Sequence, residues 1–309
     1  MPAYRDHIAL RMQEAIETYC TAEPLKRYAL LFVEEKLKGS MLFGELTAAH
    51  YYMFEGHSAD IARAAAAVEL FVLASDILDD LEDEDAPSMP WMGVPAPHAL
   101  HVAASLMTLS QQTLLDSVAD VALRGELAVM MNKQMLRSAN GQMLDLMNTI
   151  QEEEPFLEMV RQKSSSLLVL ACMAGVLAAG RPWNEEVAMY AADLGIAAQI
   201  RNDCRDLLRW DEKSDFLGKK KTLLTLYLLE GPEEQSGWMR DYYEGRSPKE
   251  DIRDKHSLFL QICEQSGVLL YGSVISRMHY DKFQDRFLAI EADSKSKDRV
   301  IQLLTGEFA

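Results

Sequence analysis

The stretch VELFVLASDILDDLEDED, residues 68–85, joins an apolar run to seven carboxylates within its last eleven positions. Its Ala, Leu and Val residues favour a helix, and it lacks the period-two alternation of a strand. Residues four apart share a helix face, so Asp79 and Asp83 point the same way with Asp80 beside them. Most acidic runs are solvated helix ends. These acids directly follow a stretch that must be buried, which favours a binding role.

A second acidic segment, AAQIRNDCRDLLRW at residues 197–210, also follows an apolar helical run. Oxygen ligands of this kind suit hard divalent cations, above all Mg²⁺, which bridges carboxylates to substrate phosphates. We therefore expect the two acidic segments to form a pair across a cavity that binds Mg²⁺ and a diphosphate. The predicted metal ligands are Asp79, Asp83, Asn202, Asp203 and Asp206.

Basic residues near these segments provide the positive charge that a diphosphate leaving group requires. Lys163 lies in RQKSSSLL, Lys220 lies in the lysine run of GKKKTLL, and Arg201 and Arg205 flank the second acidic segment. Each of these taken singly is typical of a surface charge. Because Lys163 and Lys220 adjoin apolar helical segments, we expect these two to bind the diphosphate.

The chain organisation indicates an all-α protein. Its 309 residues are 49% hydrophobic and 26% charged, enough to bury a large core. Pro and Gly separate segments of helical length, and no repeat or low-complexity linker divides the chain, so we predict one large helical domain over residues 1–309. The predicted helical segments are 59–84, 126–150, 156–179, 184–212 and 221–230. Residues 231–255 are expected to form a solvated connection with one short helix at most.

Charge and cysteine content exclude several classes of function. A net charge of −17 argues against nucleic acid or an anionic membrane as the main partner. The four cysteines have no C-x-x-C spacing, which argues against a thiolate zinc site or a disulfide framework. The polar N-terminus and the short apolar run at 167–180 predict neither a signal peptide nor a membrane span, so a cytoplasmic location is expected.

The order and spacing of these motifs resemble the trans-isoprenyl diphosphate synthase, or polyprenyl synthetase, superfamily from about residue 35 to about residue 230. Asp79-Asp80-Leu81-Glu82-Asp83 is similar to its first aspartate-rich motif, and Asn202-Asp203-x-x-Asp206 to its second. Further matches are Glu69 and Ser75 before the first motif, Gly141-Gln142 with Asp145, Lys163-Ser164, Gln199, and Asp215 with Lys220 and Thr222.

The resemblance implies an isoprenoid synthase fold, an all-α bundle around a central prenyl-binding cavity, in a homodimer. It also implies Mg²⁺-assisted loss of diphosphate from an allylic substrate, which leaves a carbocation in an apolar pocket. The implied catalytic residues are Asp79, Asp80, Asp83, Asp203, Lys163 and Lys220. The expected substrate-binding residues are Gln142, Asp145, Gln199, Lys163 and Lys220, with Phe71, Ala74 and Ser75 at the pocket floor, where the small residues leave room for about fifteen carbons.

This sequence departs from chain-elongating members where they hold the second substrate, isopentenyl diphosphate. Ser40, Met41 and Phe43 stand where those members carry a Lys and two Arg, and Val72 replaces a His. Without gaps, Ser88 and Met89 stand at the position of an arginine pair. Each lost charge-assisted hydrogen bond is worth roughly 1.5 to 3 kcal/mol. We therefore do not expect condensation with isopentenyl diphosphate.

Within the superfamily the chain is most similar to ComQ-type members, which prenylate a tryptophan of a quorum-sensing precursor peptide. An acceptor without a diphosphate explains the missing cations. A terpene cyclase remains an alternative, although Asp206 and Trp210 occupy the Ser and Glu positions of the cyclase N-D-x-x-S-x-x-x-E motif. A chain-elongating synthase and an inactive regulatory subunit are less favoured alternatives.

Overall fold

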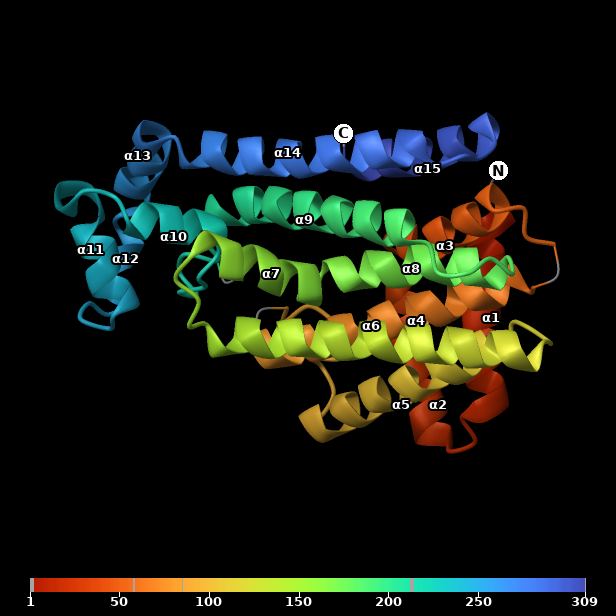
Figure 1. Cartoon of the computed structure of the whole chain (residues 1–309). Coiled ribbons are helices and arrows are strands. Elements are labelled where there is room, and N and C mark those ends of the chain that lie inside the picture. The colour runs from red at the N-terminus through yellow and green to blue at the C-terminus, as the bar shows by residue number, and fades with distance from the viewer. Residues whose placement is uncertain (1–2, 58, 85, 212–213, 309) are drawn as a thin grey trace. The chain divides into compact units, whose positions relative to one another are not determined.

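The structure, a computed structural model, describes residues 3–308 except 58, 85, 212 and 213. The described residues form helices and no strands, which confirms the all-α prediction (Figure 1). In chain order the helices are α1 (Ala3–Tyr19), α2 (Glu23–Lys36), α3 (Leu42–Met53), α4 (Ile61–Asp83), α5 (Ala96–Leu115), α6 (Val121–Met147), α7 (Glu153–Lys163), α8 (Ser165–Ala178), α9 (Glu185–Leu207), α10 (Leu223–Leu229), α11 (Glu233–Tyr243), α12 (Glu250–Arg253), α13 (His256–Ser266), α14 (Val268–Ala289) and α15 (Ser294–Phe308).

Contacts between residues divide the chain into two compact units. Unit 1 comprises residues 1–137, 166–191 and 286–309, and unit 2 comprises residues 138–165 and 192–285. The boundaries between the units fall inside α6, α9 and α14, and directly after the first residue of α8. A single domain over residues 1–309 stays a prediction.

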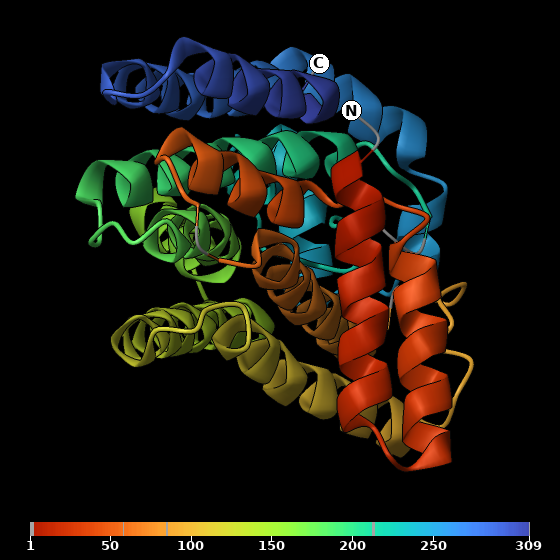
Figure 2. The ribbon, with the colours of Figure 1, turned by 90° about the vertical axis from the view of Figure 1, so that its right-hand side faces the viewer.

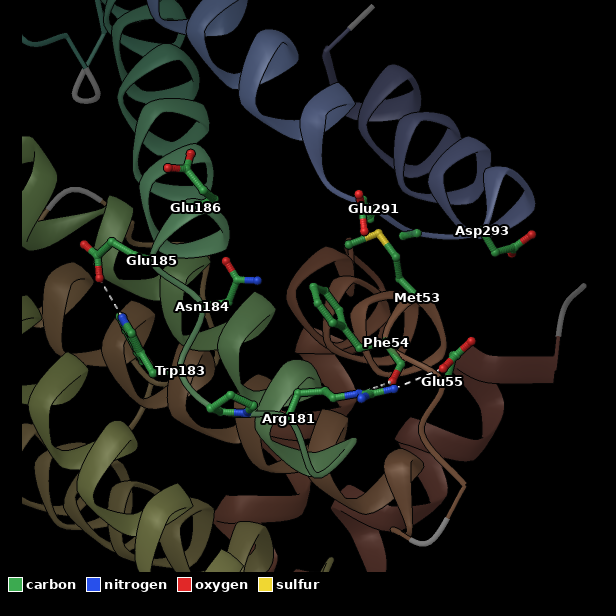
Figure 3. A pocket seen from close by; sticks show the side chains of 12 residues that line it. Met53, Phe54, Glu55, Arg181, Trp183, Asn184, Glu185, Glu186, Glu291 and Asp293 are labelled. Carbon is green, nitrogen blue, oxygen red and sulfur yellow. Dashed lines mark hydrogen bonds and ion pairs between the residues drawn. The ribbon is translucent and has the colours of Figure 1, made fainter.

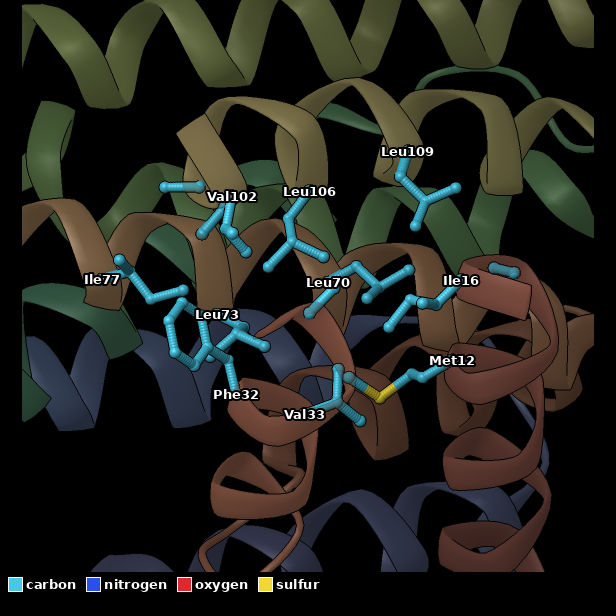
Figure 4. Packing of buried hydrophobic residues seen from close by; sticks show 14 of the residues in the cluster. Met12, Ile16, Phe32, Val33, Leu70, Leu73, Ile77, Val102, Leu106 and Leu109 are labelled. Carbon is cyan, nitrogen blue, oxygen red and sulfur yellow. The ribbon is translucent and has the colours of Figure 1, made fainter. Parts of the chain in front are cut away.

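Helix α4 is central to unit 1, where it packs against α1, α3 and α5. Its four alanines at 64–67 are fully buried, and such small side chains let neighbouring helices approach closely. The Asp60 side chain accepts a hydrogen bond from the Arg63 N–H and caps the helix start. Helices α1 and α2 form a hairpin beside it (Figure 2). Figure 4 shows Met12, Val33, Leu70 and Leu106 of these helices and α5 packed together in one apolar cluster.

In unit 2, α14 packs along the C-terminal part of α9. The Ser276 hydroxyl donates to the Ala197 carbonyl at 2.8 Å, and His279 Nδ1 lies 2.9 Å from Asp193 Oδ1. A separate aromatic cluster surrounds Phe216, whose ring centroid lies 4.4 Å from that of Phe259. These contacts fix the frame that carries the second acidic segment.

The helix predicted over 156–179 breaks at Ser164 into α7 and α8. Two other helices approach the chain closely at this break. A Cβ on Gly141 of α6 would lie 2.1 Å from the Lys163 backbone nitrogen, and one on Gly195 of α9 would lie 2.4 Å from Ser165 Oγ. Only glycine permits backbones to come so close. The break is therefore a tertiary feature that helix propensity cannot reveal.

The prediction of a solvated connection over 231–255 was wrong. This segment holds α11 and α12, and α11 buries Ser236, Met239 and Tyr242. Three-residue spacing of the buried positions is the amphipathic signal of a helix, and the surrounding charges and glycines obscured it.

No single helix in the described ranges has both the length and the hydrophobicity to cross a membrane. Helices α13 and α14 reach the length and hydrophobicity of a membrane span only when they are taken together, and they are bent by 54° relative to each other.

His50 of α3 is fully buried and has a structural role. Its Nδ1 donates to the Leu46 carbonyl at 2.7 Å, so the neutral ring accepts at Nε2 from the Tyr190 hydroxyl at 2.5 Å. Burial lowers the pKa of His50 to about 4, from an ordinary value of 6.5. The folded protein therefore resists protonation of this ring, whereas the unfolded chain accepts the proton near pH 6.5.

This difference predicts a pH-dependent loss of stability. This contribution to stability is complete above pH 6.5. As the pH falls toward 4, the free energy of unfolding should decrease by on the order of 3 kcal/mol. His50→Gln should lose less free energy of unfolding between pH 7 and 4 than the wild type, as measured by urea denaturation. His57→Gln, which changes an exposed histidine, should match the wild type. Parallel pH profiles for His50→Gln and the wild type would contradict the assignment.

Candidate active site

The first acidic segment forms the last turns of α4 in unit 1. Asp79, Asp80 and Asp83 are partly exposed, whereas Ile77 of the same helix is fully buried. The Trp91 indole N–H donates to Asp80 Oδ2 at 2.7 Å, and its ring packs edge-on against Phe32. Trp91 therefore holds the middle acid of the motif in one orientation. Only the tertiary structure reveals this positioning role.

A buried charge cluster lies earlier on α4. Glu69 is fully buried and accepts a hydrogen bond from the Gly44 N–H at 2.6 Å, while burial raises the pKa of its carboxyl. Lys36 Nζ lies 3.6 Å from Glu69 Oε2 and 3.2 Å from Asp76 Oδ2. A Cβ on Gly44 would meet Glu69 Cγ at 2.9 Å, so glycine is needed here. The two carboxylates thus neutralise the ammonium group of Lys36.

The predicted pocket floor lies on the same helix. Phe71 and Ala74 are buried, and Ala74 packs in the apolar cluster that includes Leu70 and Leu73. Ser75 is half-buried, and its hydroxyl donates to the Phe71 carbonyl at 3.0 Å. Their role in setting prenyl length stays a prediction.

The second acidic segment lies in unit 2 near the end of α9, where a chain of hydrogen bonds orients Asp203. Ser164 Oγ donates to Gln199 Oε1 at 2.8 Å, and Gln199 Nε2 donates to Asp203 Oδ1 at 2.8 Å. The sequence analysis had already identified Ser164 and Gln199 as residues of two separate family motifs. The structure brings them together within one hydrogen-bonded line.

The other oxygen of Asp203, Oδ2, is buried and has no hydrogen-bond partner among the residues that the structure describes. Burial, together with the charges of Asp215, Asp145 and Asp206, raises the pKa of Asp203 to about 8. A buried carboxylate near several acids is unfavourable unless a cation compensates it. This donor set therefore fits a hard divalent cation such as Mg²⁺.

Further ligands would have to complete such a site. Among the residues that the structure describes, no group of three or more His, Cys, Asp or Glu could hold a metal ion by itself. This fits Mg²⁺, which keeps several waters and binds through one or two carboxylates plus substrate phosphates. Of the other predicted ligands, Asn202 Oδ1 accepts from Arg205, and Asp206 Oδ1 lies 3.9 Å from Arg209.

The predicted lysine and acid of α7 and α6 pair directly in unit 2. Lys163 Nζ lies 2.5 Å from Asp145 Oδ2, and the Ser138 hydroxyl donates to the Lys163 carbonyl at 3.2 Å. Gln142 is half-buried on α6. The close approach of Gly141 to Lys163 brings this helix pair together. The glycine of the G-Q-x-x-D element is thus a packing requirement.

In the lysine run, Lys219 is held through its side chain and Lys220 through its backbone. Lys219 Nζ lies over the Tyr242 ring, 4.5 Å from its centroid. The Lys220 carbonyl accepts hydrogen bonds from the Thr225 hydroxyl at 2.8 Å and the Tyr243 hydroxyl at 3.0 Å. The backbone of Lys220 is therefore fixed by α10 and α11.

In unit 1, three of the positions that lack the cations of elongating synthases carry packed apolar side chains, and Ser40 and Ser88 are exposed. Met41 and Val72 are buried, at 1% and 2% exposure. Met89 packs against the apolar cluster that contains Trp91 and Phe32. These positions offer no cation to a second diphosphate.

A cavity of about 610 Å³ opens in unit 1 where α3 ends and α9 begins (Figure 3). Arg181 donates to the Phe54 carbonyl at 3.3 Å and pairs with Glu55, while the Trp183 indole donates to Glu185. The lining contains none of the predicted site residues.

Comparison with known proteins agrees with this geometry. The model of the family described as Polyprenyl synthetase matches residues 36–260. The chain belongs to the polyprenyl synthetase family. It is 32% identical over 302 residues to the tryptophan prenyltransferase ComQ of Bacillus subtilis subsp. natto, covering 96% of this chain and 91% of that relative. It is 25% identical over 256 residues to a short chain isoprenyl diphosphate synthase of Methanothermobacter thermautotrophicus, covering 76% of each chain.

Solved structures of geranylgeranyl pyrophosphate synthases have a similar fold. A geranylgeranyl pyrophosphate synthase from Corynebacterium glutamicum, complexed with isoprenyl diphosphate and magnesium, superposes with a TM-score of 0.81. The match covers 98% of both chains at 15% identity. The predicted isoprenoid synthase fold is therefore confirmed, and the chain is an enzyme of a prenyltransferase family.

Proposed function

We propose that this polyprenyl synthetase family member is an Mg²⁺-dependent prenyltransferase with an allylic diphosphate of the geranyl or farnesyl class as its donor. Its acceptor is a tryptophan of a quorum-sensing precursor peptide. The observation that carries the proposal is the apolar packing of Met41, Val72 and Met89 alongside acidic motifs that are intact. The likeness to ComQ tryptophan prenyltransferases supports the choice of acceptor.

The residues of the two acidic segments and the two lysines act on one donor diphosphate. Mg²⁺, when bound, supplies positive charge that stabilises the departing diphosphate. Asp79, Asp83, Asn202, Asp203 and Asp206 would hold the metal together with water and phosphate oxygens. Lys163 and Lys220 bind the diphosphate and offset the negative charge that develops on it.

Transfer exchanges one bond for another. The C–O bond between prenyl C1 and the diphosphate breaks, and its electron pair leaves with the diphosphate. The indole ring supplies the pair for the new bond to C1, and loss of a proton from the acceptor restores charge balance. Buried apolar side chains such as Phe71 and Ala74 keep water from the carbocation.

The cyclase alternative rests on the Asn202-Asp203 pair alone. Trp210 stands at the last ligand position of that motif, and its ring stacks on His256 at 4.7 Å within an aromatic cluster. An indole in this setting is no metal ligand. The intact acids likewise count against an inactive subunit.

The deciding experiment is incubation of the protein with Mg²⁺ and geranyl, farnesyl or geranylgeranyl diphosphate, with and without a tryptophan-containing peptide. We expect diphosphate release and a prenyl mass increase on the peptide, and little turnover without it. The same peptide with Trp replaced by Phe is the control. Terpene products without acceptor would establish a cyclase, and elongated diphosphates after addition of isopentenyl diphosphate would establish a chain-elongating synthase.

We also propose that the enzyme is a cytoplasmic homodimer. In unit 1, Val129 and Leu136 of α6 are 56% and 66% exposed, and their seven-residue spacing places them on one helix face. Exposed apolar side chains on one face mark a protein contact surface. Sedimentation equilibrium should give twice the chain mass, and Leu136→Lys should lower it. A monomeric wild type at micromolar concentration would contradict the proposal.

A further inference from the structure

The lysine run raises a question of register, because Lys219, Lys220 and Lys221 are chemically equivalent neighbours. Lysine is a point charge on a flexible four-carbon stem, so its usefulness depends on where its backbone is held. A shift of the backbone by one residue would place the ammonium group of a different lysine at the diphosphate. The backbone of this loop in unit 2 must therefore be fixed if one lysine is to serve the diphosphate.

Asn148, directly after α6, holds the backbone on both sides of Lys220. Its Nδ2 donates to the Lys219 carbonyl at 2.8 Å, and its Oδ1 accepts from the Lys221 N–H at 2.8 Å. An amide that donates and accepts in this way reproduces the pairing of a backbone peptide group. One side chain thus brackets the middle lysine.

Two features show that this arrangement is specific. Asn148 has a φ of 50° and Lys219 a φ of 56°, both in the left-handed region that non-glycine residues rarely adopt. Asparagine is among the residues that tolerate this conformation best. Lys219 is at the same time drawn onto the Tyr242 ring, and the Lys220 N–H donates to the Asp215 carbonyl at 2.9 Å.

We propose that Asn148 is a positioning residue that sets the register of the lysine run and so selects Lys220 for the substrate diphosphate. The inference rests on the proposed function, since it concerns how that function's donor is held. Thr225 and Tyr243 complete the support by donating to the Lys220 carbonyl. A charge displaced by about 1 Å can cost up to a hundredfold in rate, which is why such a bracket matters.

The test uses the full-length protein with inorganic pyrophosphate and Mg²⁺, measured by calorimetry, together with kcat and KM for the donor. Asn148→Gly keeps a residue that accepts the positive φ but removes both hydrogen bonds. We expect it to weaken pyrophosphate binding by about tenfold. The loss in Lys220→Ala should be larger. Asn148→Asp keeps the acceptor oxygen and loses the donor, so its effect should be intermediate. Lys282→Ala, which removes an exposed cation on α14, should leave binding unchanged.

The double variant Asn148→Gly with Lys220→Ala separates positioning from general weakening of the fold. If Asn148 acts through Lys220, the double variant binds pyrophosphate no more weakly than Lys220→Ala alone. Additive losses, or wild-type affinity in Asn148→Gly while Lys220→Ala is impaired, would overturn the inference and leave the proposed function standing. Absence of Mg²⁺-dependent pyrophosphate binding in the wild type would overturn both.

Discussion

Replacing Asp203 with asparagine should lower Mg²⁺-dependent diphosphate release on the order of a thousandfold, which corresponds to about 4 kcal/mol in the barrier. Asp203 has the features of a carboxylate poised for a cation. Gln199 orients one oxygen, and the other is buried with no partner in the described part of the chain. Burial, with several neighbouring acids, raises the pKa of this carboxyl. Asparagine keeps the shape and loses the charge that the metal requires.

The stability of this variant should move in the opposite direction from its activity. In the absence of metal, a buried carboxyl near other acids destabilises the fold when it ionises, so Asp203→Asn should unfold at the same or a higher temperature. Mg²⁺ with pyrophosphate should raise the melting temperature of the wild type and have a much smaller effect on the variant. Calorimetric melting with and without the two ligands measures this.

A matched control distinguishes a site effect from a general loss of negative charge. Asp285→Asn changes an exposed aspartate near the C-terminal end of α14 and should retain wild-type activity and response to Mg²⁺. Activity of Asp203→Asn within threefold of the wild type would remove Asp203 from the metal site.

Gly141→Ala should have the second large effect, a loss of about 3 kcal/mol or more in the free energy of unfolding. The added methyl would lie 2.1 Å from the Lys163 nitrogen and 2.7 Å from the Gln162 carbonyl carbon. Both are backbone atoms, so no side chain can rotate away, and α6 must separate from α7. Since Lys163 pairs with Asp145 across the same contact, we also expect weaker pyrophosphate binding.

Gly125 provides the control on the same helix. A Cβ there meets no atom within 4 Å, so Gly125→Ala should stabilise the protein by about 0.5 to 1 kcal/mol through helix propensity. Urea denaturation of both variants measures the two free energies. Equal effects at the two positions would show that α6 and α7 are less closely packed than described.

Local sequence patterns predicted much of the fold and many of the candidate residues. The helix predicted over 59–84 is α4, Ile61–Asp83, so its ends were predicted to within two residues. Helix propensity and the burial pattern both favour a helix there. The segment at 231–255 was misread, because the residues that α11 buries are few and lie among charges. The break at Ser164 was missed since neither neighbouring residue breaks helices.

The motif residues gained their roles in different ways. Asp203, Gln199 and Lys163 were predicted from type and spacing, and the hydrogen bonds of unit 2 then explain how each is oriented. The sequence did not predict the positioning roles of Trp91 and Asn148, since each acts through a partner outside its own helical turn. Asp80 is eleven residues from Trp91, and Lys219 is 71 residues from Asn148.

The helical class, the family and the types of residue in the acidic segments and the lysine run follow from the sequence, because periodicity, residue type and motif spacing are local properties of the chain. Tertiary packing sets which oxygen of Asp203 lacks a partner within the described ranges, and which side chains hold Asp80 and Lys220. Burial and hydrogen-bond geometry depend on segments that come together only on folding.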